Sequence, residues 1–221
     1  SHFEILKNKF SIILEDSISI FSHNRLMKSY LWKINKGKLN KTNLALYSNF
    51  VKQNYKIDSR NDFNKLWKWS VDNPKFFWES VWNFTKVKGE LGNTLFKESN
   101  IFYKNKFFPD TKLNYAKNIL KKNNQETSIV FRSENGHRNY LSWKNLNLNV
   151  SQISNWMKLN GIKKGDRVAA YMPNIPEAVT AYIGTAVLGA VWSSCSPDFG
   201  ISGVIDRFSQ IEPKILFIGD K

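Results

Sequence analysis

The segment Arg167-Val-Ala-Ala-Tyr-Met172 decides the fold class, because this short apolar run reads as a buried strand and is followed at once by a helix. The helix pattern covers residues 176–188 and opens with a proline, which the first turn of a helix tolerates. Three further elements follow, a strand, a helix and a strand, over residues 191–195, 203–210 and 215–218. This β-α-β-α-β order predicts a parallel sheet with right-handed crossovers and helices on both faces.

A long helix and a hairpin precede this region. Strand patterns cover residues 127–133 and 139–142, and Gly136 marks the turn between them. Apolar residues then recur every three or four positions from residue 142 to residue 160, which predicts an amphipathic helix. Ser142 is suited to cap the start of this helix, and Gly161 is suited to end it.

The amino-terminal half reads as helical. Helical spacing covers residues 41–56, a second helix follows Asp62 as far as Val71, and a third begins near Asn73-Pro74. Four tryptophans lie between Trp67 and Trp82, and we interpret them as core or inter-domain packing because large rings bury much area. Gly and Asn residues interrupt residues 86–109, which predicts a long loop or linker.

Composition restricts the class of protein. The chain has 221 residues, 42% of them hydrophobic, which is enough for a packed core, and its formal net charge is +15. The lysines are scattered among asparagines without an arginine-rich stripe, so we expect no nucleic-acid partner, and a basic binding module stays the alternative. No apolar stretch approaches the roughly 20 residues of a membrane span. The single cysteine, Cys195, excludes an intrachain disulfide and fits the cytoplasm.

The residues that could carry chemistry follow the strands of the predicted sheet. Ligands of parallel sheets bind beyond the carboxyl ends of strands, which directs attention to the segments after Met172 and Ser194. A purely structural interpretation has Ser196 or Asp198 capping the next helix and Gly200 supplying a turn. We interpret Cys195 as packing, because no histidine forms a recognisable dyad with it. The sequence contains no phosphate loop of P-loop type, dinucleotide fingerprint or metal-ligand cluster.

Six stretches carry a family resemblance, namely residues 66–71, 112–120, 161–168, 171–177, 189–200 and 206–214. In order and spacing they resemble the acetoacetyl-CoA synthetases of the adenylate-forming superfamily. Gly165-Asp-Arg-Val168 is shared broadly in that superfamily, whereas Trp192-Ser-Ser-Cys-Ser-Pro-Asp-Phe-Gly200 is narrower and favours the acetoacetate branch.

The resemblance implies a domain organisation. Residues 29–120 would form a helical cap region, and residues 121–221 would begin the AMP-binding domain, whose parallel sheet would be incomplete. Residues 1–28 match no family segment, so we expect an unmatched extension with Met27 as a possible true start. We therefore expect the chain to be an amino-terminal fragment of a longer enzyme.

The resemblance also implies an activity. Such a ligase uses ATP, CoA and Mg²⁺ to convert acetoacetate to its adenylate and then to acetoacetyl-CoA, with release of pyrophosphate and AMP. By position, Ser196, Pro197, Asp198 and Phe199 would lie on the CoA side of the site. No catalytic or metal-binding residue falls within the chain, which alone would be inactive. The alternatives are another short-chain synthetase, for acetate or propionate, and the basic binding module.

Overall fold

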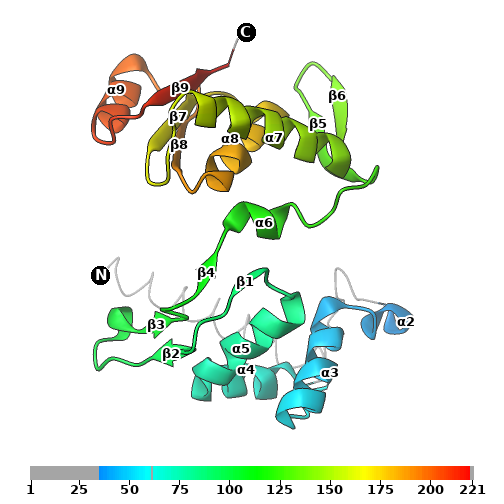
Figure 1. Ribbon diagram of the computed structural model, residues 1–221. Coiled ribbons are helices and arrows are strands. Elements are labelled where there is room, and N and C mark those ends of the chain that lie inside the picture. Colours follow the sequence, from blue (N-terminus) through cyan, green and yellow to red (C-terminus); the bar gives the residue numbers. More distant parts are fainter. Residues whose placement is uncertain (1–34, 61, 220–221) are drawn as a thin grey trace, which may run out of the picture. The chain divides into compact units, whose positions relative to one another are not determined.

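The computed structural model describes residues 35–60 and 62–219 (Figure 1). These residues divide into two compact units, one ending at Leu66 and the other beginning at Trp67. The expected extension over residues 1–28, with its possible start at Met27, lies outside the described residues. Among the described residues, no helix combines the length and the apolar character that crossing a membrane requires.

The first unit is helical, as the sequence pattern predicts. It contains α2 (Lys36–Leu39), α3 (Asn43–Tyr55) and the start of α4 (Phe63–Asp72). Thr42 caps α3, because its side chain accepts a hydrogen bond from the backbone N–H of Ala45 at 3.2 Å. Asp62 fills the same role for α4, with the backbone N–H of Lys65 at 3.0 Å. The predicted helices are therefore confirmed to within two residues at each end.

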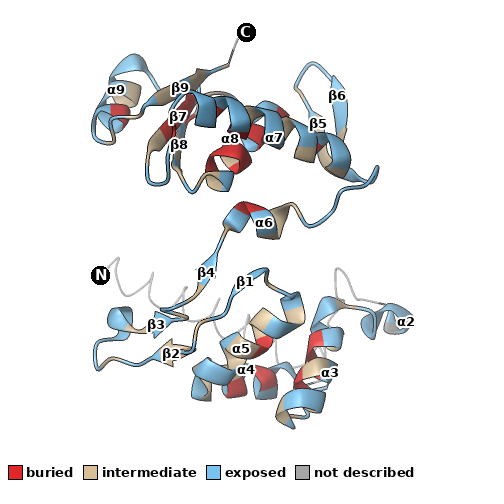
Figure 2. Ribbon diagram, in the orientation of Figure 1, coloured by how far each residue is buried: buried red, intermediate tan, exposed pale blue. Residues whose placement is uncertain are grey.

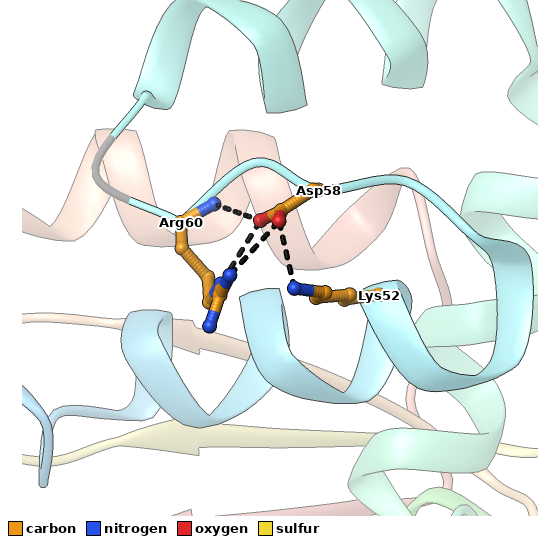
Figure 3. Close-up of polar contacts among 3 residues, drawn as sticks. All are labelled: Lys52, Asp58 and Arg60. Atoms are coloured by element: carbon orange, nitrogen blue, oxygen red, sulfur yellow. Dashed lines mark hydrogen bonds and ion pairs between the residues drawn. The ribbon is translucent and has the colours of Figure 1, made fainter.

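An ion-pair cluster fixes the loop between α3 and α4 (Figure 3). Oδ2 of Asp58 lies 2.8 Å from Nζ of Lys52 and 2.9 Å from Nη2 of Arg60, and Oδ1 accepts a hydrogen bond from Nε of Arg60 at 3.0 Å. The hydrogen bonds from Arg60 and then Lys52 hold the pKa of Asp58 well below its usual range. Because Lys52 belongs to α3, this cluster attaches the loop to the last turns of that helix.

The second unit begins with the rest of α4 and with α5 (Pro74–Thr85). Trp69 is buried and meets the ring of Phe77 edge-on, with ring centroids 6.2 Å apart. Core packing, as predicted for the tryptophans, therefore holds for Trp69, whereas Trp67 and Trp78 are exposed by 58% and 43%. Helical spacing places Trp78 and Trp82 on one face of α5 but does not determine what covers that face.

The expected loop over residues 86–109 is partly wrong, because short paired strands interrupt it. The elements of this region are β1 (Gly89–Glu90), β2 (Phe96–Lys97), the 3₁₀-helix η1 (Phe102–Lys104), β3 (Lys106–Phe107), β4 (Lys112–Leu113) and α6 (Tyr115–Ile119). β1 pairs with β4 and β2 with β3, both antiparallel. Two-residue strands are too short to show the alternation that identifies a strand in sequence.

The hairpin and the long helix lie where predicted. They are β5 (Thr127–Arg132), β6 (Arg138–Ser142) and α7 (Trp143–Leu159), and β5 pairs antiparallel with β6. The Ser142 side chain accepts a hydrogen bond from the backbone N–H of Asn145 at 3.2 Å, which confirms it as the cap of α7. Gly161 has φ of +82°, a left-handed conformation that suits the end of a helix.

A three-stranded parallel sheet follows, as the β-α-β-α-β order predicts. Its elements are β7 (Arg167–Tyr171), α8 (Pro176–Val187), β8 (Val191–Cys195), α9 (Ile201–Ser209) and β9 (Ile215–Ile218). The strand order is β8-β7-β9, with Ala169 of β7 opposite Ser193 on one side and Leu216 on the other. The α/β fold class is thereby confirmed.

Helices cover both faces of this sheet, also as predicted. On one face, Met157 of α7 packs with Ile162 and Val168, and on the other Phe208 of α9 packs with Ala169 and Cys195. Figure 2 shows the buried residues gathered along β7, α7 and α8. Because Val168 and Ala169 are neighbours on β7, their side chains point to opposite faces, and the central strand is buried on both.

Candidate functional site

The carboxyl edge of the sheet brings together the two segments that the sequence singles out. Tyr171 ends β7 and lies opposite Cys195, which ends β8. The backbone N–H of Met172 still donates to the carbonyl of Cys195 at 3.3 Å. After this hydrogen bond the two segments lead to different helices. The segment after β7 leads into α8, and the segment after β8, residues 196–199, leads into α9. We call residues 196–199 the edge loop.

The edge loop is a tight turn whose backbone closes on itself. The N–H of Phe199 donates to the carbonyl of Ser196 at 3.1 Å, and Oγ of Ser196 donates to Oδ2 of Asp198 at 2.8 Å. Ser196 is half-buried, whereas Pro197, Asp198 and Phe199 are exposed. All four predicted residues therefore share one loop, with three of them presented to solvent.

The structure does not support the expectation that Ser196 or Asp198 caps the helix after the loop, α9. The residue at the start of α9 is Gly200, and no side chain caps the helix there. Asp198 instead pairs with the hydroxyl of Ser196. The backbone N–H groups of the first turn of α9 are thus not satisfied by a loop side chain, and the polar groups of the loop serve its own turn.

A cavity of about 380 Å³ opens beside the edge loop. Its polar side chains include Ser194, Ser196 and Asn174, and its aromatic walls are Tyr182 and Trp192. Of the four predicted residues, only Ser196 lines this cavity. The sequence analysis did not predict Tyr182 and Trp192 as cavity walls. Their positions in a helix pattern and a strand pattern predict only that they pack against neighbouring residues.

Tyr182 is attached to the preceding part of the chain. Its ring centroid lies 5.9 Å from that of Tyr115 in α6, and the hydrogen bond between the two hydroxyls raises the pKa of Tyr182. Asn114 reinforces this attachment, since its Nδ2 donates to the carbonyl of Ala186 at 2.9 Å. The cavity wall on α8 is therefore fixed by contacts with α6 and the residue before it.

Tyr171 and Arg207 are two further residues that sequence reasoning missed. The hydroxyl of Tyr171 lies 3.0 Å from the carbonyl oxygen of Pro197 and 3.3 Å from that of Phe199. The guanidinium carbon of Arg207 lies 4.3 Å from the ring centroid of Phe199. No local pattern reveals these contacts, because Tyr171 and Phe199 are 28 residues apart.

The surroundings of Cys195 agree with the packing role expected from the sequence. Cys195 is 4% exposed and packs between Ala169 and Phe208, which supports a packing role. Among residues 35–60 and 62–219, no group of three His, Cys, Asp or Glu side chains could hold a metal ion. His137 is exposed between β5 and β6, and His2 and His23 lie outside the described residues.

A larger cavity, of about 1230 Å³, belongs to the first unit. Its charged side chains are Asp58, Arg60, Asp62 and Lys65, two carboxylates and two cations with no net sign to select a ligand. Ser59 also lines it, and its buried hydroxyl makes no hydrogen bond with the part of the chain that the structure describes. No sequence motif attaches a chemistry to this cavity, so the edge loop is the candidate site.

Comparison with known proteins gives one consistent result. Residues 117–221 match the family model of AMP-binding enzymes. The acetoacetyl-coenzyme A synthetase of Rhizobium meliloti (strain 1021) is 42% identical over 159 residues, which are 72% of this chain and 24% of the relative. The acetoacetyl-CoA synthetase of Xenopus tropicalis is 34% identical over 179 residues, which are 79% of this chain and 26% of the relative.

A solved structure agrees with these relatives. The acetoacetyl-CoA synthetase from Streptomyces lividans has a TM-score of 0.78 and 28% sequence identity, covering 85% of this chain and 30% of that chain. The chain thus spans about a quarter of the length of the curated relatives it matches.

Proposed function

Because this chain is homologous to acetoacetyl-CoA synthetases over most of its length, we propose that it is part of an AMP-forming acetoacetate:CoA ligase. The observation that carries the proposal is the 42% identity to the Rhizobium meliloti relative across 72% of the chain. The fold supports it, since the match to AMP-binding enzymes coincides with the hairpin, α7 and the parallel sheet.

In the proposed reaction, a carboxylate oxygen of acetoacetate attacks the α-phosphorus of ATP and pyrophosphate leaves. The thiol of CoA then attacks the acyl carbon of the adenylate, loses its proton, and AMP leaves. Adenylation replaces a poor leaving group by a good one, which is the physical reason for spending ATP. Mg²⁺ would neutralise phosphate charge in the first step.

The residues of this chain fit CoA better than they fit ATP or Mg²⁺. Ser196 of the edge loop lines a cavity of about 380 Å³ with aromatic walls, a concave site of a size that takes part of a small-molecule ligand such as the arm of CoA. On the positional correspondence that the family resemblance implies, we assign Ser196, Pro197, Asp198 and Phe199 to the CoA side of the proposed site. The described residues offer no cluster for a metal ion, and the sequence has no phosphate loop, so we assign no residue of this chain to ATP or Mg²⁺.

The proposal includes the domain boundaries that the resemblance implies, with a helical cap over residues 29–120 and the AMP-binding domain from residue 121. It also includes a cytoplasmic location and small-molecule partners only. The scattered lysines support the absence of a nucleic-acid partner, and the single cysteine suits a reducing compartment.

The test is to express the complete coding sequence that contains this chain and to measure AMP formation with ATP, CoA and acetoacetate. We expect turnover that requires all three, with acetate and propionate at least tenfold poorer substrates. A preference for acetate or propionate would favour the alternative short-chain synthetase. The 221-residue chain alone serves as the negative control, because it spans only about a quarter of its relatives.

The alternative of a basic binding module is tested on the same preparation. If this alternative holds, the formal charge of +15 on the 221-residue chain produces an affinity for polyanions such as heparin that falls steeply with salt. Strong salt-dependent polyanion binding together with absent ligase activity would contradict the enzyme proposal.

A further inference from the structure

The conformation of the edge loop depends on groups outside it. Within the loop, the described hydrogen bonds are the turn between Phe199 and Ser196 and the contact of Ser196 with Asp198. Three of its four residues are exposed, so little side-chain packing restrains it. Whatever holds the loop in one conformation must therefore come from the neighbouring strand and helix.

Tyr171 supplies the first restraint, from the end of β7. Its hydroxyl lies within hydrogen-bond distance of two loop carbonyls, at 3.0 Å from Pro197 and 3.3 Å from Phe199. A phenolic hydroxyl has one proton to donate, so the shorter contact with Pro197 is favoured. Because β7 is the central, buried strand, the hydroxyl is held at a fixed position and fixes the loop backbone in turn.

Arg207 supplies the second restraint, from α9. Its guanidinium carbon lies 4.3 Å from the ring centroid of Phe199, well within the range of a cation–π contact. The next residue, Phe208, is buried against the sheet, which anchors this turn of α9. The Phe199 side chain, although exposed, is thereby held against the helix instead of turning freely in solvent.

We propose that Tyr171 and Arg207 are positioning residues for the CoA step, acting through the edge loop that they hold from two sides. This inference rests on the proposed function, in which the edge loop lies on the CoA side. Tyr171 orients the loop backbone through Pro197, and Arg207 orients the Phe199 ring. Because both residues contact the edge loop, which the proposal assigns to the CoA side, loss of either should impair the use of CoA and spare adenylation.

The decisive variant is Tyr171→Phe in the proposed full-length ligase, because it removes one hydroxyl and keeps the ring. We expect KM for CoA to rise about three- to tenfold, the range that one neutral hydrogen bond provides. The acetoacetate-dependent exchange of pyrophosphate into ATP, which reports adenylation alone, should stay within about twofold. Tyr140→Phe is the matched control, since Tyr140 is an exposed tyrosine of β6, and KM for CoA should not change.

Arg207 is tested by a pair of variants. Arg207→Ala removes both the charge and the planar group and should raise KM for CoA, again without slowing exchange. Arg207→Lys keeps a cation beside Phe199 and should recover part of the loss, because lysine also forms cation–π contacts but lacks the planar stack. A fully restored KM in Arg207→Lys would still support positioning through charge.

Three results would overturn the inference. One is an unchanged KM for CoA in Tyr171→Phe while Asp198→Ala or Phe199→Ala raises it, which leaves the proposed function standing. Another is an equal loss of exchange and CoA turnover, which assigns both residues a general structural role. The last is a wild-type enzyme that exchanges pyrophosphate but never uses CoA, in which case the proposed function fails first.

Discussion

Nζ of Lys214 lies 2.8 Å from Oδ1 of Asp166, which ties the residue before β9 to the residue before β7. The other carboxylate oxygen, Oδ2, accepts a hydrogen bond from the backbone N–H of Lys163 at 2.8 Å. The backbone N–H of Lys214 also donates to the carbonyl of Arg167 at 2.9 Å. Asp166 therefore aligns the starts of two paired strands and closes the turn that precedes β7.

The first prediction concerns acid stability. The hydrogen bond from Lys214, followed by that from the Lys163 backbone, lowers the pKa of Asp166. Its contribution to stability is therefore complete above the unfolded-state pKa of about 3.9 and is lost as pH falls through the lower folded-state pKa. Asp166→Asn should unfold at a lower temperature near neutral pH and lose part of the acid-induced decrease in Tm. Thermal unfolding from pH 7 to pH 2 measures both effects.

The control for this experiment is Asp206→Asn. The backbone carbonyl of Asp206 accepts hydrogen bonds from Ser209 and Gln210, and these remain in the variant. Its Tm profile should follow the wild type. An Asp166→Asn profile parallel to the wild type at every pH would contradict the role assigned to the ion pair.

The second prediction concerns the contact between α7 and α8. A Cβ added to Gly184 would lie 2.6 Å from Cγ2 of Ile153, a distance that forces the helices to shift. Alanine improves helix propensity by about 1 kcal/mol, whereas overpacking costs about 1–3 kcal/mol. Because Cγ2 is attached directly to Cβ and cannot turn away alone, the overpacking cost lies in the upper part of this range, and we expect Gly184→Ala to destabilise the fold by a net of about 1–2 kcal/mol. Urea unfolding of the chain measures this change.

Two further variants make this test specific. Ile153→Ala removes the clashing methyl group, so the double variant with Gly184→Ala should lose less stability than the two single changes added together. Gly203→Ala lies in α9, where the nearest atom to a new Cβ is 3.6 Å away, and it should stabilise the chain. Strict additivity of the first pair would show that the steric contact does not matter.

The third prediction concerns the core. Met157 is fully buried on α7 and packs with Ile162 and Val168 beneath the sheet. Met157→Ala should reduce the free energy of unfolding by about 2–5 kcal/mol, because it removes apolar contacts and leaves a cavity. Met157→Leu keeps the volume and should cost less than about 1.5 kcal/mol. Similar losses in both variants would mean that the stability depends on the shape of the side chain at this site and not on its volume.

The fourth prediction concerns the start of α7. Replacing Ser142 by alanine leaves the N–H of Asn145 without its side-chain acceptor and should cost about 1 kcal/mol. Ser142→Asp retains an acceptor and should keep nearly all of the stability. Hydrogen exchange at the first turn of α7 gives a local readout, and equal protection in the alanine variant would argue against the cap.

The sequence predicted the regular elements of the carboxyl-terminal half well, because their signals are local. The cap at Ser142, the end at Gly161 and the apolar run of β7 each depend on a few neighbouring residues. The start of α9 was placed two residues late, at Gly203 instead of Ile201, because Gly200 carries no capping side chain to mark it.

Long-range contacts were beyond the reach of the sequence. Gly89 of β1 pairs with Leu113 of β4, 24 residues further along the chain, so no local sequence pattern predicts either two-residue strand. The hydroxyl of Tyr171 and the ring of Phe199 gain their roles only once β7 and the edge loop are adjacent. The sequence thus identified the edge loop as a candidate, through the sheet order and the family resemblance, but not the residues that hold it.

The strand order β8-β7-β9 also bears on how the chain emerges from the ribosome. The strand at the centre of the sheet is the first of the three to be synthesised, and each later strand adds to a free side of it. Assembly can therefore proceed outward in the order of translation, without opening a pair already formed. A nascent chain that has emerged as far as the end of α9 would already contain the edge loop, Tyr171 and Arg207, on which the CoA proposal depends, before β9 exists.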